Sequence, residues 1–426
     1  MQGSLVSCEV ESSAVRVWVT KSAAFFCRLL LRVVQILLPK MKFQVMTTNH
    51  QFFGHLLLEP EKYLSARDAK KEIFEIDFIG EKDWRNIGVS CHGATNQNVF
   101  TLWTLGRLKR APNSQLIRMW KRSVHRVPGF VAGMMIRASR SGKLENVSEY
   151  RFSSLLSIDK DLDATSAHLR FSKKELGRAR GEAKELGMNP DIPHVCLIVR
   201  NETTSSTDSE LRSRSIHDFE LAAHEIVSDG LQLVRMGASA SPLLRSDSPK
   251  LFDYANSGRR SELLDLYLLS SCAFAVSTLS GPDAACLAFR RPVLYVDLAN
   301  YALCFSGTLL TTWSPAKIVS CSTGSQLSLE EVFSSGAGWF WKDSQFLGAN
   351  LRIERSNEKE IAGYVREMLA RYHSETLLDA PTNPQQLLYQ NRFASAMGEL
   401  GEEWHGPIRS HLAESFLEAN GKWFLS

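Results

Sequence analysis

Residues 272–285 read CAFAVSTLSGPDAA, and this stretch decides the fold. Its apolar half has the length of a buried strand, its small hydroxyl residues and Gly281 make a turn, and Pro282 is suited to open a helix. Unpaired N–H groups at the start of such a helix are typical of a phosphate site. We expect Thr278 and Ser280 to add hydroxyl donors there. The same letters also fit a plain strand-to-helix turn in which Ser280 caps the helix.

The flanking sequence alternates strands with helices. Strands are predicted at residues 195–199, 231–235, 273–277 and 292–296, and helices at 218–228, 261–270 and 282–289. Strands separated by helix-length segments imply right-handed crossovers and a parallel sheet with helices on both faces. The sequence therefore predicts an α/β, Rossmann-like domain.

The rest of the chain divides by composition. Strand and helix also alternate after Pro39, as at 43–46 and 56–64, and two helix breakers, Pro190 and Pro193, mark a junction. The predicted organisation is a basic amphipathic segment at 1–40, a Rossmann-like domain at 41–188, a second at 189–355, and a helical region at 356–426.

The composition excludes several classes of protein. The 426 residues are 44% hydrophobic and 23% charged, which is ordinary for a globular protein, and the net charge of +4 is too small to imply nucleic-acid binding. The eight cysteines are scattered without a Cys-x-x-Cys pair, so we expect reduced core residues of a cytosolic protein. No dinucleotide, P-loop or zinc-protease motif occurs, and the histidines lack metal-ligand spacing. We expect neither a metal nor a cofactor.

The N-terminal segment is basic and apolar. Between residues 12 and 58 all charged side chains are Lys or Arg, and in the apolar run 23–38 Arg28 and Arg32 share one helical face. Each Arg at the centre of a membrane costs about 2.5–3.5 kcal/mol, so a crossing is disfavoured. A helix lying on anionic lipid fits, and so does a core helix whose arginines reach water. The late start of the apolar run disfavours a cleaved signal peptide.

Polar residues lie where the predicted strands end: Arg200, Arg235, Gly237, Asp253 and Tyr254. Ligands of parallel sheets bind at these ends, where an arginine can make charge-assisted bonds to a diphosphate. We expect Arg200 to contact such a ligand. For Arg235, pairing with Asp253 or Asp265 is an equal alternative.

Several of these segments resemble a known family. Residues 195–202, 230–237, 253–255, 265–268 and 277–281, with 53–55, 59–64 and the tail 416–425, are similar to a little-characterised bacterial family of predicted glycosyltransferases associated with surface polysaccharide synthesis. The second half resembles, more distantly, the donor half of heptosyltransferases and the Arg-containing strand of fucosyltransferases. Fucosyltransferases usually carry His two residues before that Arg, where this chain has Ile198, so GDP-fucose is disfavoured as the donor.

The resemblance implies the GT-B fold, in which two Rossmann-like domains face a cleft, and transfer of a sugar from a nucleotide-sugar. The diphosphate would lie against Thr278, Ser280 and Gly281, with Arg200 and Arg235 neutralising its charge in place of a metal. Candidate bases for the acceptor hydroxyl are His55, Glu59 and Glu202, and His55 fits a structural role equally well.

The implied partners are a nucleotide-sugar and a saccharide or lipid-linked acceptor, with no nucleic acid. The basic segment would hold the enzyme at the cytoplasmic face of the inner membrane. Two alternatives remain open: a nucleotide-sugar 2-epimerase of the same fold, and a non-catalytic protein that binds saccharide or nucleotide.

Overall fold

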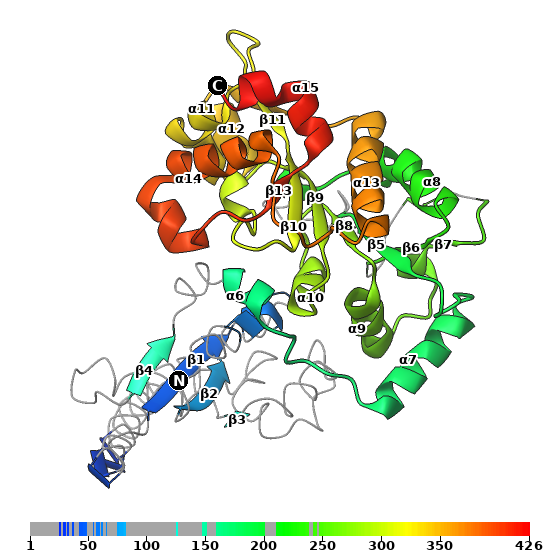
Figure 1. Cartoon of the computed structure of the whole chain (residues 1–426), viewed down its shortest axis with the longest axis vertical. Helices are drawn as coiled ribbons and strands as arrows, with labels where there is room; N and C mark the ends of the chain where they lie inside the picture. Colours follow the sequence, from blue (N-terminus) through cyan, green and yellow to red (C-terminus); the bar gives the residue numbers. More distant parts are fainter. Residues whose placement is uncertain are drawn as a thin grey trace, which may run out of the picture. The chain divides into compact units, whose positions relative to one another are not determined.

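The computed structural model describes residues 159–200, 210–237, 242–244 and 247–426. In the N-terminal part it describes four strands and scattered helical positions between residues 25 and 65. Contacts divide the chain into two compact units, Met1–Phe152 and Ser153–Ser426, called here the N-terminal and the C-terminal unit (Figure 1).

The N-terminal unit contains a parallel sheet. Its strands are β1 (Lys42–Thr48), β2 (Glu75–Glu81), β3 (His125–Arg126) and β4 (Val147–Tyr150), in the order β3-β2-β1-β4. All three pairings are parallel. This order, with the first strand between the second and the fourth, is that of half a Rossmann fold. The helix expected at 56–64 is described at Leu57, Leu58, Glu59, Glu61 and Lys62, which are helical and buried.

The C-terminal unit is built on a seven-stranded sheet in the order β13-β10-β9-β8-β5-β6-β7, parallel throughout. Its strands are β5 (His194–Ile198), β6 (Gln232–Arg235), β7 (Leu251–Phe252), β8 (Ala275–Ser277), β9 (Val293–Leu298), β10 (Thr311–Pro315) and β13 (His411–Leu412). A separate antiparallel pair joins β11 (Lys317–Ser320) to β12 (Leu351–Glu354). The prediction of an α/β chain with two Rossmann-like units is confirmed. The expected cleft between them stays a prediction.

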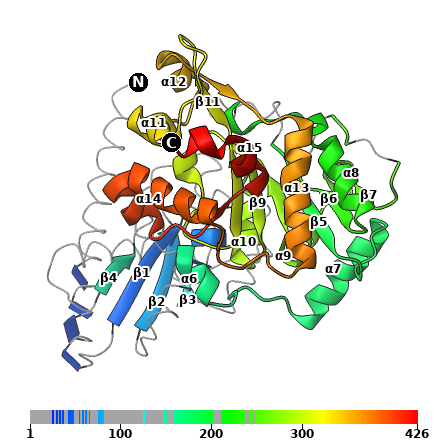
Figure 2. The ribbon, with the colours of Figure 1, turned by 45° about the horizontal axis from the view of Figure 1, so that its top comes forward.

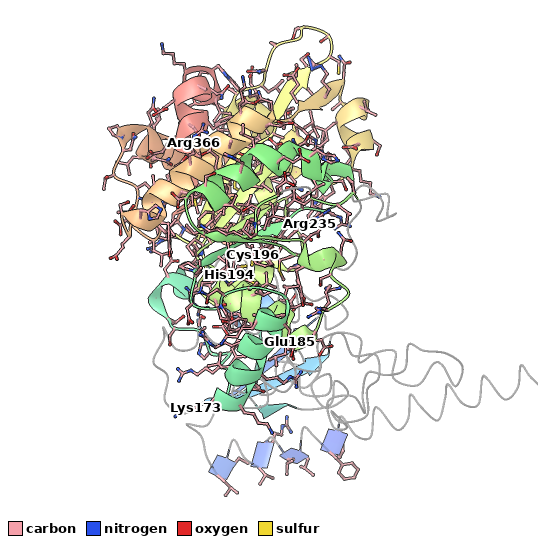
Figure 3. The ribbon with its side chains drawn as sticks, turned by 90° about the vertical axis from the view of Figure 1, so that its right-hand side faces the viewer. Lys173, Glu185, His194, Cys196, Arg235 and Arg366 are labelled. Carbon is pink, nitrogen blue, oxygen red and sulfur yellow. The ribbon has the colours of Figure 1, made fainter. Side chains whose placement is uncertain are left out.

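Helices cover the C-terminal sheet in two groups. α7 (Lys173–Glu185), α9 (Glu262–Ser271) and α10 (Asp283–Ala288) pack in one series, and α8 (Glu220–Ser228), α13 (Glu358–His373) and α15 (Glu414–Phe424) in another (Figure 2). The remaining helices are α6 (Asp159–Ala164), α11 (Leu329–Ser334), α12 (Asp343–Gly348) and α14 (Pro384–His405). Arg366 on α13 pairs with Glu225 on α8 at 2.8 Å, on the side of the unit seen in Figure 3. No described helix combines the length and apolar character needed to cross a membrane.

Side-chain capping fixes where several helices begin. Ser172 and Glu175 form a capping box at α7, and Asn357 and Glu360 form another at α13. Each box satisfies N–H groups that the helix itself leaves unpaired. Ser261 caps α9 by accepting from the N–H of Leu264 at 3.0 Å. The starts of these three helices therefore have a local cause in the sequence.

The predicted domain limits differ from the observed division. The junction expected at residues 188 and 189 falls inside the C-terminal unit, between α7 and β5, because α7 packs against α9. Asp163 on α6 binds the same unit, accepting from the N–H of Leu309 and pairing with Arg409 at 3.0 Å. The region 356–426 is not separate, since α13 packs on α8 and β13 extends the sheet beside β10.

The cysteines of the described residues are all free. Cys196, Cys272, Cys286 and Cys304 are buried, as predicted for reduced core residues. Cys321 is exposed, and for this residue the prediction of a core position is wrong. Its position in the turn after β11 explains the difference.

Candidate functional site

The C-terminal sheet has one point where its strand order reverses. From β5 the chain proceeds to β6 and β7 on one side, and then continues with β8, β9 and β10 on the other. Connections that leave in opposite directions open a crevice above the carboxyl ends of β5 and β8, and ligands of parallel sheets bind in such crevices. Arg200 follows β5 and Thr278 follows β8, so both lie at this edge.

Hydrogen bonds join the two chain segments at this point. The backbone N–H of Arg200 donates to the hydroxyl oxygen of Thr278 at 3.0 Å, and the N–H of Thr278 donates to the carbonyl of Ile198 at 3.2 Å. The Nε atom of Arg200 is buried and has no hydrogen-bond partner among the described residues. A buried donor of this kind is costly unless something completes it. The structure therefore brings together two of the residues expected to bind phosphate.

The turn after β8 is closed by a carboxylate. Asp283 accepts from the hydroxyl of Ser277 at 2.7 Å and from the N–H of Ser280 at 2.6 Å. Burial raises the pKa of Asp283 to about 6, so the group is still largely ionised at neutral pH. This differs from the expected open helix terminus, because the N–H of Ser280 is already satisfied and a carboxylate opposes a second anion. Gly281 is exposed beside it.

Backbone strain marks the same turn. Leu279, between Thr278 and Ser280, has φ of +62°, in the left-handed region. A residue with a large side chain is rarely found there, at a cost of about 1–3 kcal/mol, and such positions gather at ligand sites. The side chain of Leu279 is nevertheless almost fully buried. The left-handed turn at Leu279 is thus one that the local sequence disfavours, and the side chain of Leu279 is packed in the interior.

A small cavity of about 20 Å³, with room for about one water molecule, lies beside this turn. Its walls come from the ends of β8 and β9, from the 3-10 helix Glu210–Arg212 and from the segment before α12. Arg212 contributes a guanidinium, whose Nη1 donates to the carbonyl of Leu279 at 3.4 Å. Trp341 contributes an indole that is 49% exposed. The lining therefore combines a cation with an aromatic face.

Asn300 supplies the most specific polar group of this cavity. Its side chain is 7% exposed, and its Oδ1 accepts from the N–H of Leu303 at 3.1 Å. Its Nδ2 is buried and has no hydrogen-bond partner among the residues that the structure describes. Because Oδ1 accepts this bond, the orientation of the amide is set and the N–H groups of Nδ2 are left to donate. A ligand with an acceptor oxygen would complete it.

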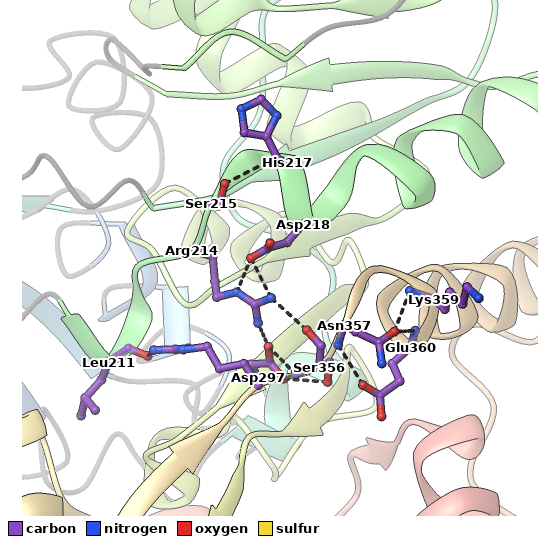
Figure 4. A network of polar contacts seen from close by, with 11 residues as sticks. Leu211, Arg214, Ser215, His217, Asp218, Asp297, Ser356, Asn357, Lys359 and Glu360 are labelled. Atoms are coloured by element: carbon purple, nitrogen blue, oxygen red, sulfur yellow. Dashed lines mark hydrogen bonds and ion pairs between the residues drawn. The ribbon is translucent and has the colours of Figure 1, made fainter.

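Asp297 lines the cavity, and a buried arginine neutralises its charge. Asp297 pairs with Arg214, and it accepts from the N–H of Ser356 at 3.0 Å and from its hydroxyl at 2.7 Å (Figure 4). Arg214 also donates from Nε to Asp218 at 2.9 Å. Both Asp297 and Arg214 are buried. The negative charge of Asp297 is thus balanced within the protein.

On the β6–β7 side, the predicted residues hold the fold together. Arg235 is fully buried, lies 3.3 Å from Asp253 and donates to the carbonyl of Pro242 at 2.6 Å. Burial lowers the pKa of Arg235, while Asp253 counteracts this effect. Tyr254 is buried, and its hydroxyl contacts the backbone of Ser261. The pairing with Asp253 that the sequence allows is present, and contact of Arg235 with a ligand stays a prediction.

Four predicted site residues remain, and the structure describes two of them. Gly237 follows β6 with φ of +153° and is half-buried. Glu59 is described in the N-terminal unit, where it is helical and buried. His55 and Glu202 lie outside the described residues. The assignment of the catalytic base therefore stays a prediction. No group of three or more His, Cys, Asp or Glu side chains within the described ranges is arranged to hold a metal.

Sequence reasoning missed three residues of the cavity: Arg212, Asn300 and Trp341. Asn300 carried a usable signal, since it comes two residues after the end of β9, as Arg200 comes two residues after the end of β5. Arg212 lies in a Ser- and Thr-rich loop and Trp341 lies before a short helix, so their positions depend on tertiary packing alone.

Comparison with known proteins gives structural matches only. No family model matches the chain, and no curated protein matches it in sequence. The solved structures that are similar include Escherichia coli ADP-heptose LPS heptosyltransferase II, at 15% identity and a TM-score of 0.32, covering 65% of this chain and 86% of that one. A glycosyl transferase family 9 protein from Veillonella parvula is similar at 11% identity and a TM-score of 0.34, covering 65% of this chain and 81% of that one.

Proposed function

We propose that the chain is a glycosyltransferase that moves a sugar from a nucleotide-sugar to a saccharide or lipid-linked acceptor in cell-surface glycan synthesis. One observation carries this proposal. At the point where the sheet order reverses, Arg200 and Thr278 are joined beside a cavity that presents a guanidinium and an amide donor, Arg212 and Asn300. A nucleotide-sugar offers an anion for the first and hydroxyl oxygens for the second.

The two arginines would bind the diphosphate. The side chain of Arg200 leaves the backbone at the end of β5, and Arg212 lines the cavity beside Thr278. Negative charge develops on the nucleotide diphosphate as the bond to the sugar breaks, and fixed guanidinium groups stabilise that charge without reorganising. Their positive charge would serve the purpose that a divalent metal serves in other transferases. The donor diphosphate would also hydrogen-bond the buried Nε of Arg200.

The sugar ring would lie at the mouth of the cavity, because the cavity itself has room for about one water molecule. Trp341 offers a half-exposed aromatic face against which the apolar side of a pyranose can pack, and Asn300 offers a fixed N–H to a hydroxyl. Arg214 already balances Asp297 in the wall, so an uncharged ring meets no unpaired charge from that residue. The diphosphate of the donor would thus lie on one side of Thr278, and the sugar on the other.

The chemical step needs a base for the acceptor. The acceptor hydroxyl oxygen would attack the anomeric carbon, the bond between that carbon and the phosphate oxygen would break, and the hydroxyl proton would pass to a base. Glu59, His55 and Glu202 remain the candidates that the sequence supplies. A lipid-linked acceptor would make the cytoplasmic face of the membrane the place of reaction.

Nucleotide binding to the purified chain tests the proposal. Calorimetry or thermal shift with UDP, GDP, ADP and CMP should find one nucleotide that binds, and Arg200→Ala should weaken its binding about tenfold to a hundredfold. Arg352→Ala is a matched control, because Arg352 is exposed on β12 and pairs with Glu354. Chelation of divalent metal should leave binding and turnover unchanged.

Incubation with the matching nucleotide-sugar then separates the alternatives. Transfer or slow hydrolysis releases the nucleotide diphosphate, whereas a 2-epimerase yields an isomeric nucleotide-sugar. Binding without either product would indicate a non-catalytic protein. Failure of every nucleotide to bind, or equal binding by Arg200→Ala, would exclude the proposed donor site.

A further inference from the structure

The helical positions described between residues 25 and 37 form an uncovered apolar surface. Seven large side chains are 45–78% exposed, and they are called here the apolar stripe: Phe25, Phe26, Leu29, Leu30, Val33, Ile36 and Leu37. The rings of Phe25 and Phe26 lie 6.0 Å apart, edge to face. Solvent-exposed apolar residues are normally scattered, and a contiguous group of this kind indicates a binding surface.

Helical geometry puts all seven residues on one side. At 100° per residue, their positions fall within an arc of about 140°, which is the width of the buried face of an amphipathic helix. Arg32 is exposed and lies at the edge of this arc. Long arginine side chains at such an edge can extend alongside a surface that covers the stripe.

The charge around the stripe identifies the kind of surface that it fits. From residue 12 to residue 58 the sequence has six basic and no acidic side chains. A second copy of the chain in a two-fold contact would bring the same patch against itself, and the arginines would repel. A surface of anionic lipid attracts them, and its acyl chains accept the apolar side chains. Charge complementarity therefore favours lipid over a second copy.

We infer that the apolar stripe docks the chain on an anionic lipid surface, with the stripe facing the acyl chains and Arg32 at the phosphate level. This goes beyond the proposed transferase reaction, since it concerns residues 25–37 and needs no nucleotide. The docking is reversible. Its strength depends both on apolar burial and on the negative charge of the lipid.

Sedimentation of the full chain with vesicles tests the inference. Vesicles of equal parts phosphatidylglycerol and phosphatidylcholine should bind the protein, and pure phosphatidylcholine should bind it several-fold more weakly. Phe26→Ser with Leu30→Ser should lower the partition coefficient about a hundredfold or more, because each removes a large apolar side chain that the acyl chains would cover. Arg32→Gln should lower it about fivefold on anionic vesicles and have little effect on neutral ones.

Leu347→Ser is the matched control, because Leu347 is 71% exposed on α12, outside the stripe. It should bind vesicles as the native chain does. Nucleotide binding by the stripe variant should be unchanged, which separates this inference from the proposed donor site. Absence of binding to anionic vesicles, or equal binding by the stripe variant, would overturn the inference. So would a native dimer that the stripe variant converts to a monomer, since a second copy would then cover the stripe.

Discussion

Replacement of Arg214 by Met should destabilise the C-terminal unit through a single buried charge. Arg214 and Asp297 are 5% and 0% exposed at their side chains, so the substitution leaves a carboxylate buried without its counter-ion. Removing one partner of a buried pair costs about 3–5 kcal/mol. Two hydrogen bonds from Ser356 to Asp297 remain, so the expected cost lies at the lower end of this range. We therefore expect a loss of about 3 kcal/mol in the free energy of unfolding at neutral pH.

Thermal and urea unfolding, followed by circular dichroism, measure this loss. A loss of about 3 kcal/mol corresponds to a fall of about 6–12 °C in Tm for a unit of this size. Arg214→Met with Asp297→Asn should recover most of it, because the second change removes the unpaired charge. Arg352→Met is the control, since the exposed pair with Glu354 contributes less than about 1 kcal/mol. A loss in Arg214→Met no larger than in the control would refute the reasoning.

Three further predictions concern the same unit. Burial raises the pKa of Glu367 from its ordinary value of 4.5 to about 7, so the folded state binds the proton more tightly than the unfolded state. The free energy of unfolding therefore falls as the pH rises from about 4.5 to about 7. Glu367→Gln should therefore be more stable than the native chain near pH 8, by up to about 3 kcal/mol, and equal to it near pH 4 in urea titrations. Asn300→Ala and Trp341→Ala should each weaken binding of the nucleotide-sugar about threefold to tenfold in calorimetry and leave binding of the free nucleotide diphosphate unchanged. Equal losses for both ligands would instead indicate that the two residues contact the nucleotide. A Cβ at Gly338 would come within 2.8 Å of the ring of Phe333, which is buried, so Gly338→Ala should cost about 1–3 kcal/mol by thermal unfolding, and an unchanged Tm would show that the ring can move.

The sequence predicted the strands of the C-terminal sheet well because each is a short apolar run between helix-forming segments. Residues 195–199, 231–235 and 273–277 overlap β5, β6 and β8, and all of those strands are fully buried. The edge strand β13 has only two residues, His411 and Leu412, and was read as part of a helical region. Its pairing with β10 is decided by packing of the C-terminal helices.

The candidate site was predicted in part for the same physical reason. Arg200 and Thr278 follow from one rule, that the carboxyl ends of parallel strands meet at one edge, and this rule needs no knowledge of side-chain contacts. The choice for Arg235 between a ligand and Asp253 could not be made from the sequence. It depends on whether the end of β6 faces solvent, and only the packed structure buries it.

The sequence by itself determined the alternation of strands and helices, the parallel sheet and the basic N-terminal surface, because periodicity and charge are local properties of the chain. The tertiary structure alone decided that Arg214 neutralises Asp297, and that Arg212, Asn300 and Trp341 line one cavity. These groups are up to 129 positions apart (341 − 212), and their meeting depends on how helices pack on the sheet. Contacts between residues so far apart leave no periodic trace in the sequence.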